Sequence, residues 1–193
     1  MRLTILCLVA STVLPSASQA QAPVFAITPV ESKIKFDVKA SVAINGTFDK
    51  WDATLTFATP DINTGVLEIK IQADSVDTGS GMKNGKLKGK NFFDVKQNPL
   101  ITFLSKKIVQ TGQDTFEVDG DFTIRGVTKP EKLSLVVSGA GTGAGAIKGT
   151  MAFDRKEYGM NSGIPFIKIA NRVEVTVGFM AKQVSGPRLV YQQ

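Results

Sequence analysis

Period-two alternation of apolar and polar residues constrains this chain more than any other feature. From Val118 to Ile124 the apolar residues fall on one face, and Asp119, Asp121 and Thr123 fall on the other. This is the period of a β-strand with one face in water and the other face buried. The chain is therefore expected to build a sheet whose inner face meets either a packed core or a cavity.

The same pattern recurs along the chain and predicts eight strands. They span Lys33–Val42, Thr47–Phe57, Leu67–Ala73, Ile101–Val109, Thr115–Ile124, Glu131–Ser138, Ile147–Phe153 and Arg172–Met180, after a short extended segment at Phe25–Ile27. Short, evenly spaced strands are typical of a sandwich or barrel. Asn45-Gly46 predicts a hairpin turn after the first long strand, and Ser80–Lys90 predicts at most a short helical connector. A closed barrel of eight strands has room for side chains or one small ligand.

The N-terminus has the features of an export signal over residues 1–20. Arg2 supplies a positive charge, Leu3–Leu14 an apolar core, and Ser18–Ala20 a small-residue cleavage site. The mature protein is then expected to begin near Gln21 and to be periplasmic or secreted.

The rest of the chain is long enough for one domain with a sizeable core. We expect this domain to span residues 21–182 and to be followed by a flexible C-terminal tail over residues 183–193. Gly139–Gly145, where glycine predominates, predicts a mobile hairpin loop.

Composition argues against several kinds of chemistry. The single cysteine, Cys7, lies inside the predicted signal, and the sequence contains no histidine. The mature protein therefore lacks thiolates, disulfides and the commonest metal ligand, and we expect no cofactor and no metal. Loss of the signal removes Arg2 and no other charge, so the net charge of +6 falls by one. No focused basic stripe accompanies it, so nucleic-acid binding is not expected.

Three further segments have a distinctive order and spacing. They are Leu87–Val95 with its continuation through Pro99 to Ile101–Ser105, then Gly120–Pro130, and then Ala152–Met160. Together they resemble the YceI-like family of exported lipocalin-like proteins, often called polyisoprenoid-binding, over Phe25–Lys182. The resemblance implies an all-β, eight-stranded antiparallel barrel with a short helix near one end. It also implies an elongated apolar channel for a long-chain isoprenoid, a quinone or a similar amphiphile. Relatives often carry a histidine near the positions of Glu31 or Ala40; its absence here means that no metal role carries over.

The inward-facing apolar residues are the main candidates for binding such a ligand. The candidate set is Phe36, Val38, Phe48, Trp51, Phe57, Phe92, Phe93, Phe103, Phe122 and Phe153. Taken alone, buried aromatic residues are explained by an ordinary core. The family resemblance favours a channel instead, because each buried methylene of a lipid chain contributes about 0.8 kcal/mol.

Two arginines stand where strands end. Arg125 and Arg155 are candidates for contact with a ligand headgroup at the barrel mouth, through a phosphate or carbonyl group. The alternative, which the residues alone favour, is an arginine–carboxylate clamp that ties barrel corners through Asp94, Asp121 or Asp154.

Four lysines, Lys83, Lys86, Lys88 and Lys90, lie in the segment that interrupts the strand pattern. They are candidates for transient contact with anionic lipid headgroups. An ordinary solvated face explains them equally well.

We therefore expect an exported lipid-binding protein that carries or sequesters an amphiphile without catalysis. One alternative is an accessory protein of a membrane redox or stress-response system, which an exposed apolar patch would favour. A less favoured alternative is an enzyme that acts on a bound lipid through Asp94, Asp154 and Tyr158. It would need a carboxylate with a raised pKa facing the cavity.

Overall fold

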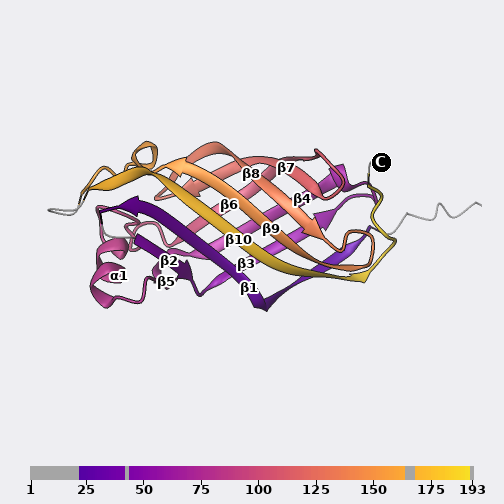
Figure 1. Cartoon of the computed structure of the whole chain (residues 1–193), viewed down its shortest axis with the longest axis horizontal. Helices are drawn as coiled ribbons and strands as arrows, with labels where there is room; N and C mark the ends of the chain where they lie inside the picture. The colour runs from indigo at the N-terminus through magenta and orange to yellow at the C-terminus, as the bar shows by residue number, and fades with distance from the viewer. Residues whose placement is uncertain (1–21, 42–43, 164–167, 192–193) are drawn as a thin grey trace, which may run out of the picture.

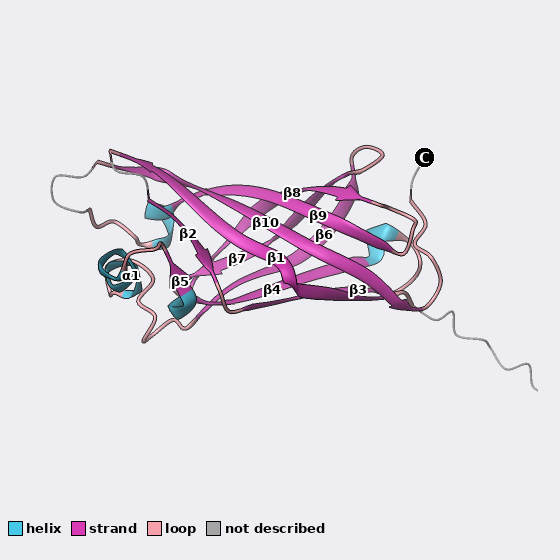
Figure 2. Ribbon diagram, turned by 60° about the horizontal axis from the view of Figure 1, so that its bottom comes forward, coloured by secondary structure: helices cyan, strands magenta, loops and turns pink. Residues whose placement is uncertain are grey.

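The computed structural model describes residues 22–41, 44–163 and 168–191, so the predicted signal lies outside the described residues. Figure 1 and Figure 2 show the strands as a closed antiparallel barrel, which confirms the predicted fold class. The eight barrel strands are β1 (Val24–Ala40), β3 (Trp51–Phe57), β4 (Gly65–Gln72), β6 (Leu100–Gln110), β7 (Thr115–Ile124), β8 (Val127–Ser138), β9 (Ala144–Asp154) and β10 (Ile169–Ser185). β1 pairs with β10, for example at Phe36 and Val175, and this pairing closes the ring.

One end of the barrel carries most of the remaining elements (Figure 1). They are β2 (Ile44–Phe48), β5 (Val76–Asp77), the helix α1 (Gly81–Lys88) and the 3-10 turns at Ala73–Ser75 and Arg155–Tyr158. The position of α1 confirms the predicted short helical connector. The chain ends at the opposite end of the barrel, where the 3-10 turn Ile62–Thr64 also lies.

The predicted hairpin turn at Asn45-Gly46 is wrong. Both residues lie within β2, where Asn45 pairs with Asp37 and Gly46 with Phe36. The ring of Phe36 lies against Gly46 so closely that a Cβ there would be 2.8 Å from it. Asn-Gly is therefore used here for close packing of an aromatic ring rather than for a turn.

The strand predicted over Thr47–Phe57 is broken into two. β2 ends at Phe48 and β3 begins at Trp51, with exposed Asp49 and Lys50 between them. A continuous strand would place Phe48 and Trp51 on opposite faces, because they are an odd number of residues apart. The break changes the phase of the alternation, so both side chains pack against the core.

Arg125 and Gly126 form the two-residue turn between β7 and β8. Both have positive φ, 55° and 73°, and Ile124 pairs directly with Val127. This is the conformation of a type I′ turn, which a two-residue hairpin loop favours. Arg125 is a non-glycine residue in this conformation, so other contacts must hold it there.

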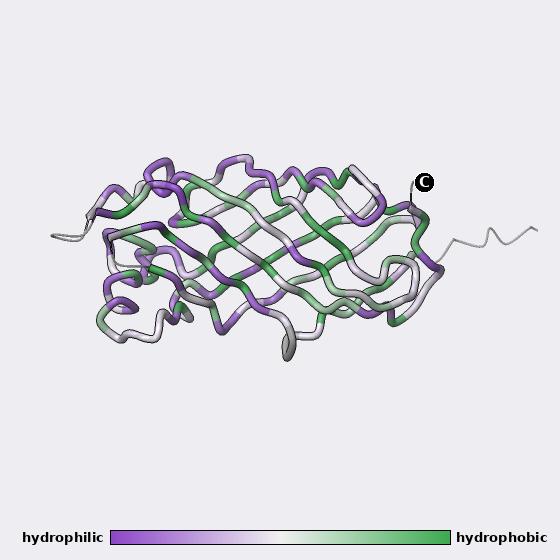
Figure 3. The backbone as a smooth tube through the Cα atoms, in the orientation of Figure 1, coloured by the Kyte–Doolittle hydropathy of each residue, from purple (hydrophilic) through white to green (hydrophobic). Residues whose placement is uncertain are grey.

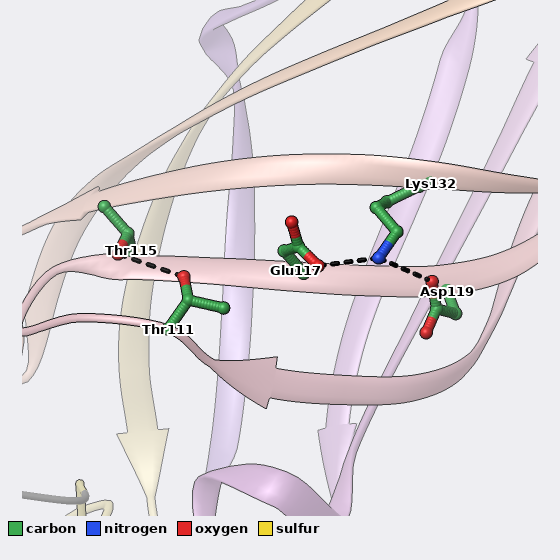
Figure 4. A network of polar contacts seen from close by, with 5 residues as sticks. All are labelled: Thr111, Thr115, Glu117, Asp119 and Lys132. Carbon is green, nitrogen blue, oxygen red and sulfur yellow. Dashed lines mark hydrogen bonds and ion pairs between the residues drawn. The ribbon is translucent and has the colours of Figure 1, made fainter.

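The strands bury one face and expose the other, as the alternation predicts. Figure 3 shows hydrophobic and hydrophilic residues alternating along the barrel strands. On the outer face of β7 and β8, Lys132 Nζ lies 2.6 Å from Glu117 Oε2 and 3.5 Å from Asp119 Oδ1 (Figure 4). In the same figure Thr111 donates a hydrogen bond of 3.1 Å to Thr115. The outer wall is thus held by polar contacts, and the interior is left to apolar side chains.

The C-terminal end of the predicted domain, Lys182, falls inside β10. β10 continues to Ser185, past the domain end predicted at Lys182. Beyond it, Val190 forms a parallel bridge with Asp61. The segment predicted as a flexible tail is therefore in contact with the barrel as far as Tyr191, which lies against Phe116.

Candidate ligand-binding cavities

A cavity of about 690 Å³, its mouth included, opens at the α1 end of the barrel. We call it the helix-end cavity. It is lined by Ile34, Phe36, Val38, Ile44, Phe48, Ile71, Leu87, Phe92, Phe93, Ile101, Phe122, Ile124, Phe153, Arg155, Met160, Ile169, Val173 and Val175. One of these side chains is charged and the rest are apolar, which suits the hydrocarbon part of a ligand.

Aromatic rings contributed by several strands and by the connector form its walls. Phe48 lies 5.6 Å from Phe36 and 5.9 Å from Phe93, measured between ring centroids. On another wall, Phe122 of β7 lies 5.0 Å from Phe153 of β9. These separations are typical of tilted aromatic pairs, so the rings brace one another around the open space.

The connector after α1 brings its two phenylalanines to the cavity through backbone hydrogen bonds. The Phe93 N–H donates to the Leu87 carbonyl at 2.9 Å, and the Asp94 N–H donates to the Gly89 carbonyl at 3.0 Å. Asp94 has a positive φ of 49°, which reverses the chain there. Leu87 is half-buried, and Phe92 and Phe93 are buried.

Arg155 is the charged residue in this wall, and it is only 6% exposed. Its guanidinium donates to the carbonyls of Ala170, Met160 and Ser162 through Nε and Nη1. Neither Nη2 nor any other atom of Arg155 contacts a carboxylate in the part of the chain that the structure describes. Burying a cation without an opposite charge is costly, so Arg155 is suited to an anionic partner.

Arg125 is placed differently. Nη1 donates to the Gly159 carbonyl at 2.6 Å and Nη2 to the Lys90 carbonyl at 3.0 Å, while its buried Nε has no hydrogen-bond partner. It does not line the helix-end cavity. Arg125 therefore ties the β7–β8 turn to the connector and to the turn after β9. Both arginines do tie corners, but through carbonyls: the predicted clamp to Asp94, Asp121 or Asp154 is wrong for the described residues.

The residues considered for catalysis do not line the cavity. Tyr158 is fully buried and donates a hydrogen bond of 2.8 Å to Glu131. Burial, followed by the hydrogen bond to Glu131, raises the pKa of Tyr158 above its ordinary value. Asp154 caps the following turn by accepting from the Lys156 N–H at 2.8 Å. Neither these residues nor Asp94 lines the cavity.

A second cavity, here the distal cavity, occupies the opposite end of the barrel. It measures about 730 Å³ with its mouth. Phe57, Ile108 and Phe116 line it, together with the glycine-rich loop between β8 and β9 and the end of the chain.

The middle of the barrel separates the two cavities, which share no lining residue. Phe179 is 2% exposed, lines neither cavity, and lies 5.3 Å from the ring of Trp51. Nearby, a Cβ on Gly149 would lie 2.5 Å from Val177 and 2.8 Å from Leu135. Leu135 of β8 and Val177 of β10 are the cross-strand partners of Gly149, so their side chains fill the space over this glycine. We call the layer formed by Trp51, Gly149, Val177 and Phe179 the partition.

The predicted ligand-binding residues divide among these three regions and one small void. Seven line the helix-end cavity, namely Phe36, Val38, Phe48, Phe92, Phe93, Phe122 and Phe153. Phe57 lines the distal cavity, Trp51 belongs to the partition, and Phe103 lines a small void between the partition and the helix-end cavity. The prediction omitted aliphatic lining residues such as Ile44, Met160 and Val173. Alternation marks most of these as inward-facing, but it does not separate lining residues from packed ones.

An apolar interior inside a closed antiparallel eight-stranded ring defines a lipocalin-like barrel. The YceI-like domain model matches residues 25–181, and the chain belongs to the YceI-like family, as the three segments predicted. A UPF0312 protein of Pseudomonas savastanoi pv. phaseolicola is 31% identical over 134 residues, covering 67% of this chain and 70% of that protein. A UPF0312 protein of Pectobacterium carotovorum is 30% identical over 142 residues, covering 72% of this chain and 73% of that protein.

Solved structures share the fold. BcnA of Burkholderia cenocepacia superposes with a TM-score of 0.72 at 24% identity, covering 80% of this chain and 99% of that one. A polyisoprenoid-binding domain from Saccharophagus degradans, implicated in plant cell wall breakdown, gives a TM-score of 0.64 at 14% identity, over 83% of this chain and 99% of that one. No helix in the described ranges is long and apolar enough to cross a bilayer. Within the same ranges, no group of three His, Cys, Asp or Glu side chains is placed to hold a metal ion.

Proposed function

We propose that this protein is exported and binds a long-chain isoprenoid, a quinone or a similar amphiphile in the helix-end cavity, without catalysis. The observation that carries the proposal is an apolar cavity with one buried guanidinium, Arg155, that has no carboxylate partner among the described residues. The hydrocarbon chain lies among the aromatic rings, and the polar head lies near Arg155. A polyisoprenoid-binding domain of the same fold supports this class of ligand.

Native mass spectrometry of the mature protein, purified without detergent, tests the proposal. We expect an added mass that organic extraction identifies as an isoprenoid or related amphiphile. Protein that carries no lipid, and that binds neither farnesyl phosphate nor farnesol when they are added, contradicts it.

The role of Arg155 is tested by comparing two ligands that share one chain. Arg155→Gln is expected to weaken farnesyl phosphate binding by about tenfold, the value of one charged hydrogen bond, and to leave farnesol binding unchanged. An equal loss of affinity for farnesyl phosphate and farnesol would mean that Arg155 only supports the wall of the helix-end cavity. Arg155→Lys, which keeps the charge, should recover part of the farnesyl phosphate affinity, and thermal melting checks that each variant folds.

Contact with a membrane surface is a further part of the proposal, and its site is α1 together with the first residues of the connector that follows it. Met82 is 87% exposed, and Lys86 and Lys90 are exposed near it, whereas Lys83 and Lys88 are half-buried. An apolar side chain among lysines suits an anionic lipid surface. Sedimentation with phosphatidylglycerol vesicles should fall in the double variant Lys86→Gln/Lys90→Gln. It should not fall in Lys106→Gln/Lys148→Gln, which removes equal charge from other elements. Equal sedimentation of all three proteins contradicts the proposed contact.

A further inference from the structure

The distal cavity has the construction of a binding site rather than of a packing defect. Its walls come from β1, β3, β6, β7, β8, β9 and β10, and include the rings of Phe57 and Phe116. Its volume is comparable to that of the helix-end cavity. Because the partition closes it off, a ligand in the helix-end cavity does not fill it.

The end of the chain forms one wall of this cavity. The Val190 N–H donates to the Pro60 carbonyl at 2.8 Å, and the Ile62 N–H donates to the Val190 carbonyl at 3.3 Å. Tyr191 lies 6.3 Å from Phe116, and Leu189 is half-buried against the core. Two backbone hydrogen bonds and two apolar contacts thus hold this segment against the barrel.

The glycine-rich loop forms the facing wall. Gly139, Gly141 and Gly143 have positive φ values of 79°, 78° and 87°, which side chains rarely adopt. Nothing lies within 4 Å of a Cβ built at Gly141 or Gly143. The loop therefore borders the mouth with glycine backbone and with the small side chains of Ala140 and Ala144.

One cation stands at this mouth. Arg188 lines the distal cavity, and its guanidinium forms no ion pair or hydrogen bond with the rest of the described chain. Two other polar side chains line the cavity. Gln183 already donates to the carbonyls of Gly186 and Pro187 at 2.9 and 2.6 Å, and the Tyr191 hydroxyl is hydrogen-bonded to the backbone of Gly141. An apolar pocket with a single unpaired guanidinium at its rim suits an alkyl chain that ends in one anionic group.

We propose that the distal cavity is a second binding site, which takes a medium-chain monoanionic amphiphile such as an alkanoate. The alkyl chain lies between Phe57 and Phe116, and the carboxylate lies at Arg188. The segment Arg188–Tyr191 is a strap that must move to admit the ligand. This site is independent of the lipid proposed for the helix-end cavity.

Titration calorimetry of the mature protein with decanoate and with decanol tests the proposal. Ala181→Leu narrows the distal cavity and is expected to lower the affinity for both ligands by about tenfold. Arg188→Gln should weaken the binding of decanoate by about fivefold, the upper range for an exposed charge pair, and should leave the affinity for decanol unchanged. Lys182→Gln removes the same charge from the exposed face of β10 and should change neither.

Three outcomes overturn the proposal. The first is no saturable decanoate binding by the unmodified protein. The second is decanoate binding that Val38→Phe, which narrows the helix-end cavity, abolishes while Ala181→Leu leaves it intact. The third is an equal loss of decanoate affinity in Arg188→Gln and Lys182→Gln. That result would mean that decanoate responds only to the net charge of the protein and not to a contact with Arg188. Thermal melting of Ala181→Leu identifies a folding defect, and the Arg188→Gln comparison then decides the question without that variant.

Discussion

The two ends of the barrel hold cavities of similar size that are closed in opposite ways. At one end α1 and its connector, an internal segment, carry Phe92 and Phe93 to the mouth, and a buried arginine lies in the wall. At the other end the wall is the chain terminus, and the cation, Arg188, is exposed. The comparison teaches that the same inward alternation can line two separate pockets, one closed by an internal connector and the other by residues 188–191.

Removal of the partition should have the largest effect, because it abolishes the distinction between the two cavities. Phe179→Ala is expected to lower the free energy of unfolding by about 3–5 kcal/mol, since the ring is buried and leaves a void. If the mutant folds, the joined cavity should accept longer isoprenoids. Urea unfolding measures the loss in the free energy of unfolding, and native mass spectrometry measures the chain lengths of the bound lipids.

The matched variant Phe179→Leu keeps much of the buried volume and should lose less stability. An unchanged distribution of bound lipid lengths in Phe179→Ala would show that Phe179 does not separate the cavities.

A substitution that fills only the helix-end cavity should show whether the two cavities bind their ligands independently. Val175→Phe adds volume at a half-buried position that lines the helix-end cavity and the small void beside it. We expect its affinity for farnesyl phosphate to fall by about tenfold, because the added ring competes with the ligand for space. Decanoate binding at the distal cavity should persist. Calorimetry measures both, and loss of both ligands together would indicate general unfolding instead of local filling.

Tyr158 supports the wall of the helix-end cavity from behind. Its ring lies 5.5 Å from Phe122 and 5.2 Å from Phe153, and Tyr158→Phe keeps these contacts while it removes the hydrogen bond to Glu131. The expected loss is about 1 kcal/mol in the free energy of unfolding. Thermal or urea unfolding at neutral pH measures it.

The same residue predicts an alkaline instability. The pKa of Tyr158 is raised in the folded state by burial and by Glu131, so the folded protein keeps a proton that the unfolded chain releases above about pH 10. The stabilisation is complete below the unfolded pKa and falls as the pH rises beyond it. Unfolding midpoints measured from pH 8 to 11 should therefore fall less steeply in Tyr158→Phe; parallel curves would contradict this assignment.

The smallest effect is expected on the outer wall, away from both cavities. The hydrogen bond to Glu117 and the charge of Asp119 raise the pKa of Lys132, so any stabilisation is present below the ordinary lysine pKa and is lost as the pH rises through the raised value. Because the network is exposed, Lys132→Ala should shift Tm by no more than about 2 °C. Neither ligand should bind differently, and a change in binding would connect this wall to the cavities.

Much of the fold was accessible from the sequence because alternation is a local property of strands. Eight strands, the short helix and the inward face followed from it, and three local motifs identified the family. The break at Asp49 and Lys50 did not follow, because a change of phase depends on how β2 and β3 meet different neighbours. The arginine clamp was mistaken for a related reason: the carbonyls of Lys90 and Gly159 reach the Arg125 guanidinium only after distant segments fold together.

The sequence by itself determined which side chains face the interior, since neighbouring residues on a strand point to opposite faces whatever surrounds them. Only the tertiary structure decided whether those side chains fill the interior or leave it open. A cavity is the part of the barrel interior that the inward-facing side chains of the eight strands do not fill, so it depends on how all of them pack together. Phe179 and its neighbours fill the middle of the barrel, whereas the ends stay open under α1 and under the chain terminus.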